Sequence, residues 1–321
     1  MSLLAKIMVE GDKHFCSKNY GGHREYPRET IYYDNLINKI IEEEGITHYI
    51  NTGDLSYGRF ATLEYRARVD ETFAIKRKLL GNNIWVVKGN HDKASYGQTE
   101  YEYYCERGDF RPSEALNIGL GTSGGGIHIE MKDYGDKSDF TRVEGAFNLI
   151  IGHGYYSMVS DNLPNYGTPS ITLDDFKPWS GVDMIIAGHI HNEHMVSGKI
   201  CDKQIKLHYL PCLMRPSYHR DGMPDKGCVD IISVYDDKGP EYERYEIELL
   251  PLEVSFDLAA IKEGDDHKLE NEHTKIDVAD VAKRMEDYVR KASDPVMAVE
   301  SMEELDPKVK EVAVELLKAS I

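Results

Sequence analysis

The sequence has no long apolar stretch and no paired cysteines, although its 321 residues are enough for one large domain. No segment approaches the ~18 to 20 apolar residues that a membrane-spanning helix needs, and the first residues lack the apolar core of a signal peptide. The five cysteines are scattered without a Cys-x-x-Cys pair, so their pattern signals neither a disulfide framework nor a thiolate zinc site. We therefore expect a soluble, cytoplasmic protein without membrane attachment.

Positive charge is also scarce, because 38 Lys and Arg face 56 Asp and Glu, for a net charge of -18. This balance argues against a protein that binds nucleic acid through a basic surface. The acidic excess lies outside residues 1–100, which carry 14 basic and 14 acidic side chains. Within that neutral part we interpret one basic cluster as a solvated helix face rather than a nucleic-acid contact: Arg59, Arg66, Arg68, Lys76, Arg77 and Lys78.

Short apolar runs recur along the chain, and each leads into a glycine followed by a polar residue. Uninterrupted apolar runs are typical of strands buried in the parallel sheets of α/β proteins. Between the first two runs, apolar residues at helical spacing end at Gly45, which predicts a crossover helix and parallel pairing of the flanking strands. A second helix is predicted over about residues 60–80. The five runs are Leu4–Val9, His48–Asn51, Ile84–Val87, Phe147–Ile151 and Met184–Ala187.

The second half of the chain has a different pattern. Residues 205–210, 229–234 and 242–250 alternate between apolar and polar, which predicts a second, more antiparallel sheet. Beyond Pro251, Asp277 and Asp306-Pro307 introduce amphipathic helices. We therefore expect a catalytic domain over residues 1–250 and a small helical appendage over residues 251–321, which would cap the active site or dock a partner.

Metal-binding residue types follow all five predicted strands. The carboxyl ends of parallel strands converge on one edge of a sheet, so residues far apart in sequence can meet there. Imidazole and carboxylate ligands suit Mn²⁺, Zn²⁺ or Fe²⁺, and two such ions form a clamp for in-line displacement at phosphorus. The sequence therefore predicts a two-metal phosphoesterase centre. The strand ends supply its candidate ligands: Asp12, His14, Asp54, the run Asn90-His91-Asp92, His153, His189 and His191.

The same residues carry a family resemblance over residues 5 to about 235. The series Asp12-x-His14, Gly53-Asp54, Gly89-Asn90-His91-Asp92, Gly152-His153 and Gly188-His189-x-His191 resembles the signature of the calcineurin-like metallophosphoesterases. The resemblance implies an α/β fold, a four-layer α/β/β/α sandwich of two mixed sheets. It also implies two divalent ions, with Mn²⁺ expected before Zn²⁺, Fe²⁺ or a mixed pair.

The resemblance further implies a role for each residue. One ion would lie on Asp12, His14 and His191, the other on Asn90, His153 and His189, with Asp54 bridging them. His91 would protonate the leaving oxygen while a bridging hydroxide attacks phosphorus, and Asp92 would orient His91.

Within this family the chain is most similar to the SbcD-type exonucleases of DNA repair, including phage versions. The similarity rests on the stretch from Tyr209 to Pro216, on Lys226-Gly227 and on the acidic C-terminal segment. It implies DNA as substrate and an SbcC-type ATPase as partner, and leaves a homodimer open. Tyr57 stands where that type has a second catalytic histidine, so the polarity of cleavage stays open. The alternatives are a phosphodiesterase or phosphatase acting on a small molecule or protein, and a metal-binding scaffold without catalysis.

Overall fold

The computed structural model describes residues 2–15, 26–56, 63–93, 98–121, 125–156, 171, 175, 179–200, 203–213 and 226–255. The chain divides into two units, Met1–Leu258 and Ala259–Ile321, and every described residue belongs to the first. The predicted C-terminal helices, together with Tyr57, lie outside the described residues.

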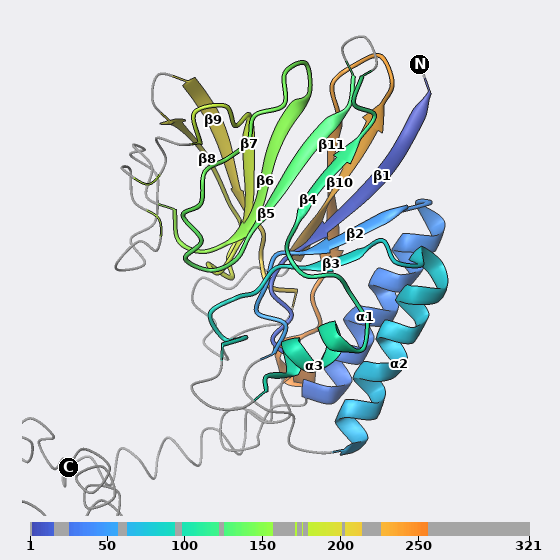
Figure 1. The fold of residues 1–321 in the computed structure, drawn as a ribbon. Helices are drawn as coiled ribbons and strands as arrows, with labels where there is room; N and C mark the ends of the chain where they lie inside the picture. Colours follow the sequence, from blue (N-terminus) through green and yellow to red (C-terminus); the bar gives the residue numbers. More distant parts are fainter. Residues whose placement is uncertain are drawn as a thin grey trace, which may run out of the picture. The chain divides into compact units, whose positions relative to one another are not determined.

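Two mixed β-sheets make up the centre of the described part (Figure 1). The first sheet has the order β11-β10-β1-β2-β3, in which β1 to β3 are parallel and β10 and β11 are antiparallel additions. Its strands are β1 (Leu3–Glu10), β2 (His48–Asn51), β3 (Ile84–Val86), β10 (Lys226–Tyr235) and β11 (Glu241–Glu248). These parallel strands confirm the predicted pairing of the first apolar runs.

The second sheet has the order β4-β5-β6-β7-β9-β8, with four parallel strands between two antiparallel edge strands. Its strands are β4 (Ala115–Ile118), β5 (Ile127–Lys132), β6 (Phe147–His153), β7 (Met184–Gly188), β8 (His194–Ile200) and β9 (Lys203–Tyr209). The α/β class with two mixed sheets is thus confirmed.

The three alternating runs of the second half do not share one antiparallel sheet, so that prediction was wrong. Strand β9 pairs in parallel with β7, whereas β10 and β11 extend the first sheet through β1. Alternation reports that the two faces of a strand have different surroundings. It does not specify the neighbouring strand, which long-range packing selects.

The main apolar core lies between the two sheets. Side chains from the inner faces of both sheets are buried there, including Ile7 and Val9 from β1, Leu149 from β6 and Ile186 from β7. Because β1, β6 and β7 are covered on both faces, their apolar residues run without interruption, as the sequence shows.

Two long helices cover the other face of the first sheet (Figure 1). Helix α1 (Tyr26–Glu43) buries Tyr33 and Ile37, and its chain leaves the helix at Gly45, whose φ of +63° favours glycine. Helix α2 (Leu63–Leu80) packs beside α1. Two short helices follow later in the chain, α3 (Glu100–Glu106) and α4 (Leu252–Ser255).

The outer face of the second sheet carries a separate apolar cluster. Ile150, Ile185 and Leu207 pack there against Tyr156 and Trp179. Most of the segment that connects β6 to β7 lies outside the described residues, and with it the outer helical layer expected on this face. Among the helices of the described residues, none has the length and apolar character to span a membrane.

Candidate metal centre

The structure brings all seven predicted ligands together at the carboxyl ends of five strands. Three of these strands belong to the first sheet and two to the second. Within each sheet the strands are parallel, so their carboxyl ends lie at the same edge, and the packed sheets bring the two edges together. Asp12 and His14 follow β1, Asp54 follows β2, Asn90 follows β3, His153 ends β6, and His189 and His191 follow β7.

One group of donors consists of Asp12, His14, Asp54 and His191, whose ligand atoms all lie within 4.8 Å of one another. The Nε2 atoms of His14 and His191 are 2.8 Å apart, and Nε2 of His191 is 3.4 Å from Oδ2 of Asp12. Two imidazole nitrogens at this separation need a proton or a cation between their lone pairs.

A second group consists of Asp54, His153 and His189, also within 4.8 Å of one another. Nε2 of His153 lies 3.3 Å from Oδ2 of Asp54. Oδ1 of Asn90 lies 3.0 Å from Nε2 of His153 and 2.9 Å from Nδ1 of His189, so the amide belongs to this group. Asp54 takes part in both groups, which is the position of a bridging carboxylate.

The backbone at the ligands is held in an uncommon conformation. The φ angles are +47° at His14, +48° at Asp54, +96° at His189 and +53° at His191. Non-glycine residues in this region cost on the order of 1 to 3 kcal/mol each, and such strain concentrates at functional sites. The surrounding structure therefore imposes the directions of these four side chains.

Two glycines before ligands permit close approach. A Cβ added at Gly89 would lie 2.0 Å from Oδ1 of Asp54, and one added at Gly188 would lie 2.1 Å from Oδ1 of Asp12. This crowding is a physical reason for the glycine-polar pattern that ends the third and fifth apolar runs.

Hydrogen bonds to the backbone orient further groups. Nδ1 of His153 donates to the carbonyl oxygen of Thr52 at 3.0 Å, which directs Nε2 toward Asp54. The carboxylate of Asp92 accepts from the backbone N–H groups of Leu55, Ser56 and Gly89. Asp92 thus joins the loops after β2 and β3, and its expected role in orienting His91 stays a prediction.

The electrostatics of the site suit a divalent cation. Burial raises the pKa of Asp12 to about 7 and lowers the pKa of His14 well below its ordinary value. Burial likewise lowers the pKa values of His189 and His191 to about 4. At His153 burial opposes protonation, but Asp12 and Asp54 outweigh it and raise the pKa to about 9. The imidazoles of His14, His189 and His191 are thus neutral lone-pair donors at pH 7. A divalent cation beside Asp12 would stabilise the ionised form of its carboxylate. The donor set therefore fits two divalent ions.

His91 lies on the open side of the centre. Its side chain is 37 % exposed, and its Nε2 lies 4.0 Å from Oδ2 of Asp54. Its backbone N–H donates to Oδ1 of Asp54 at 2.9 Å, and its ring centroid lies 5.4 Å from that of His14. A group in this position can meet a substrate without being a ligand.

Sequence reasoning missed two residues beside the centre. The ring of Tyr134 lies 5.5 Å from the ring of His189, and Nζ of Lys93 lies 5.0 Å from the Tyr134 ring centroid. Tyr134 belongs to the segment after β5, a strand end that supplies no ligand, so no motif marks it. Only the packing of the loops places this cation and this aromatic ring here.

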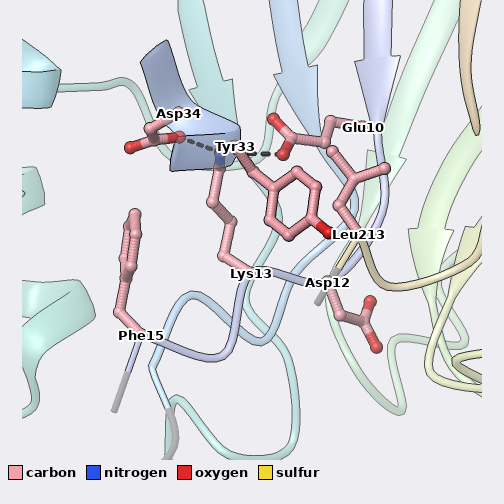
Figure 2. A pocket seen from close by; sticks show the side chains of 7 residues that line it. All are labelled: Glu10, Asp12, Lys13, Phe15, Tyr33, Asp34 and Leu213. Atoms are coloured by element: carbon pink, nitrogen blue, oxygen red, sulfur yellow. Dashed lines mark hydrogen bonds and ion pairs between the residues drawn. The ribbon is translucent and has the colours of Figure 1, made fainter. Parts of the chain in front are cut away.

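A buried cluster of charges lies beside Asp12 (Figure 2). Lys13 donates hydrogen bonds to Glu10, at 2.8 Å, and to Asp34. Nζ of Lys76 donates to Oδ1 of the same Asp34 at 3.0 Å. We call these four residues, Glu10, Lys13, Asp34 and Lys76, the lysine–carboxylate cluster. It fixes the residue between two predicted ligands.

The sequence interpretation of Lys76 was wrong, because its side chain lies inside the protein and not on a solvated helix face. Lys76 is 1 % exposed, on the side of α2 that packs beside α1. Arg66 and Arg77 of the same predicted basic cluster form ion pairs with Glu100 and Asp109. The helical spacing of these basic residues alone did not reveal that Lys76, Arg66 and Arg77 form ion pairs with acidic side chains.

A family comparison agrees with this geometry. A sequence model described as calcineurin-like phosphoesterase matches residues 5–193, a range that includes all seven predicted ligands. No match was found among curated proteins. Among solved structures, the chain is similar to a dimetal phosphatase from Danio rerio, with 11 % identity and a TM-score of 0.47 over 76 % of this chain and 100 % of that one.

Proposed function

The chain belongs to the calcineurin-like phosphoesterase family, and we propose that the phosphoester it hydrolyses is a phosphodiester bond of DNA. Family membership makes it a metal-dependent phosphoester hydrolase. The observation that carries this function is the pair of donor groups that share Asp54. Two divalent ions bound there would activate a water molecule and neutralise charge on the phosphoryl group. We propose Mn²⁺ as the ion, because each donor group includes carboxylate or amide oxygens, which suit it.

The side chains of this protein would then hold and protonate the substrate. His91 stands on the open side and would donate a proton to the leaving oxygen, as a general acid. Lys93 and Tyr134 form a rim beside His189 that offers one cation and one aromatic face. Such a combination suits a nucleotide, because the cation attracts a phosphate and a base can stack on the ring.

The choice of DNA also rests on sequence similarity to the SbcD-type exonucleases around Tyr209 and Lys226. As part of the same proposal, the C-terminal segment would dock an SbcC-type ATPase. The protein would also form a homodimer and act in the cytoplasm. The net charge of -18 favours the second candidate, a phosphodiesterase or phosphatase acting on a small molecule or protein.

An assay of the purified chain with Mn²⁺ separates these candidates. The substrates are single-stranded DNA, double-stranded DNA, bis-p-nitrophenyl phosphate and p-nitrophenyl phosphate. We expect degradation of DNA and of the diester. Turnover of either small ester while both DNA substrates stay intact would overturn the nuclease proposal.

Replacing His91 with glutamine tests the acid. We expect kcat to fall by about 10² to 10⁴, because proton transfer to the leaving group is lost. Metal content should not change, since His91 is no predicted ligand. His48→Gln is a matched control, because His48 begins β2, at the other end of that strand from Asp54. Unchanged kcat in His91→Gln would refute the role, and an inert wild type with both ions bound would support a scaffold.

A further inference from the structure

A second cluster of metal-binding side chains lies between the two sheets and is used by none of the steps above. We propose that Glu193, His208 and Cys228 form a third metal site, for a thiophilic divalent ion such as Zn²⁺. Their ligand atoms lie within 4.8 Å of one another. Glu193 comes from the connection between β7 and β8, His208 from β9 and Cys228 from β10.

Strand alternation explains why these residues meet. Leu207 packs on the outer face of the second sheet, so its neighbour His208 faces the first sheet. Val229 packs on the helix side of the first sheet, so Cys228 and Asp230 face the second sheet. His208 and Cys228 are both 0 % exposed. The proposed site therefore has one buried ligand from each sheet and the partly exposed Glu193 at its edge.

The imidazole of His208 is set as a metal ligand. Its Nδ1 donates to Oδ2 of Asp230 at 2.8 Å, which directs Nε2 away from Asp230 and toward Glu193. Burial opposes protonation of His208, but the two carboxylates outweigh it and raise its pKa, so a metal ion would displace a proton from Nε2. Nε2 is buried and makes no hydrogen bond within the described part of the chain. A carboxylate that orients a histidine through its second nitrogen is the usual arrangement behind a zinc-bound imidazole.

The spacing also fits one ion. Nε2 of His208 lies 3.5 Å from Oε1 of Glu193, long for a hydrogen bond. Two donors at about 2.0 to 2.1 Å from a tetrahedral Zn²⁺ are themselves roughly 3.3 to 3.4 Å apart. A fourth, open position would be left to water, as in other three-ligand zinc sites.

The cluster brings two carboxylates, of Glu193 and Asp230, close to a buried thiol. Arg244 forms a two-pronged ion pair with Glu193 and stands opposite Asp230 in the β10–β11 ladder. Burial raises the pKa of the Cys228 thiol, so a thiolate at this position would need a cation such as a divalent metal ion beside it. Thiolate and imidazole together favour Zn²⁺ over Mn²⁺ or Mg²⁺.

The ion would have a structural role near the dinuclear centre. Glu193 follows His191 by two residues, so an ion that holds Glu193 between β9 and β10 also restrains the loop that carries His189 and His191. The site would lock this loop to both sheets, independently of which phosphoester the enzyme cleaves.

Cobalt binding tests the proposal through the thiolate. The full chain is freed of metal, kept reduced and titrated with Co²⁺, and near-ultraviolet absorption and bound ions per chain are measured. We expect three ions per chain and a thiolate-to-cobalt charge-transfer band. Cys228→Ser should bind two ions and lose the band. Cys105 is a half-buried cysteine on α3, and Cys105→Ser should keep three ions and the band.

The third site can be tested separately from the proposed function. The ligands of the dinuclear centre contain no sulfur, so they give no thiolate-to-cobalt band. Two ions per chain without the band in the wild type would overturn the third site, and this measurement needs no variant to fold. Persistence of the band in Cys228→Ser would also overturn it. His208→Gln, which keeps all cysteines, should lower the affinity for the third ion by at least about 10-fold.

Discussion

Replacing Asp34 with asparagine should destabilise the protein strongly without changing its shape. Asp34 is the carboxylate that Lys13 and Lys76 share, and all three side chains are buried. With Glu10, the lysine–carboxylate cluster contains two positive and two negative charges. Asparagine keeps the size of the side chain but leaves one positive charge without a counter-ion.

The expected loss is about 3 to 5 kcal/mol in the free energy of unfolding, the usual cost of breaking a buried ion pair by removing one partner. Solvent screening does not reduce it, because Asp34 and Lys76 are each 1 % exposed. Lys76→Met in the same chain removes the surplus charge. The double variant should therefore be more stable than Asp34→Asn by about 2 kcal/mol.

The dependence on pH gives a second check. Burial opposes ionisation of Asp34, but Lys13 and Lys76 outweigh it and hold its pKa well below the usual range. The stabilisation is therefore complete above the unfolded pKa of about 3.9 and is lost as pH falls toward the folded pKa. The difference in the free energy of unfolding between wild type and Asp34→Asn should be constant from pH 5 to 7 and become smaller below about pH 4.

Urea unfolding of the metal-free chain, followed by circular dichroism, measures these differences without a contribution from metal binding. The single variants, the double variant and the wild type complete a double-mutant cycle. A loss below about 1 kcal/mol in Asp34→Asn, or no recovery in the double variant, would refute the charge argument.

Two further predictions concern the dinuclear centre. Gly89→Ala should lose bound metal by elemental analysis, because its Cβ would meet Oδ1 of Asp54 at 2.0 Å, whereas Gly239→Ala, with nothing within 4 Å, should keep it. Saturating Mn²⁺ should raise the melting temperature of the metal-free wild type, because binding at 100 times Kd stabilises the folded chain by about 2.7 kcal/mol per site. In Asp54→Asn, Mn²⁺ should raise the melting temperature much less, because both donor groups use Asp54. An increase as large as in the wild type would contradict the sharing of Asp54 by the two groups.

Much of the fold and of the candidate centre could be predicted from local patterns. A strand buried on both faces must be apolar throughout, and it needs a glycine where the chain turns back over the sheet edge, so both features are written in adjacent residues. Parallel strands then bring their carboxyl ends to the same edge, which is why Asp12, Asp54 and His153 could be grouped before any distance was known.

Local patterns did not contain the partners that meet through space. The alternation in β9, β10 and β11 was visible, but their assignment to two different sheets was not, because a strand carries no label for its neighbour. Lys76 looked solvated until Asp34 of another helix was placed beside it.

By itself, then, the sequence determined the strands that precede the predicted ligands, the residue types at their ends and the class of chemistry, since each depends on neighbouring residues and the general geometry of parallel sheets. Only the tertiary structure decided which distant side chains share a buried space. Glu193, His208 and Cys228 have no recognisable spacing, and they meet because a strand of each sheet and the connection after β7 lie close together in the fold. Burial then sets their chemistry, because charges removed from water must be balanced by whatever groups the packing brings near.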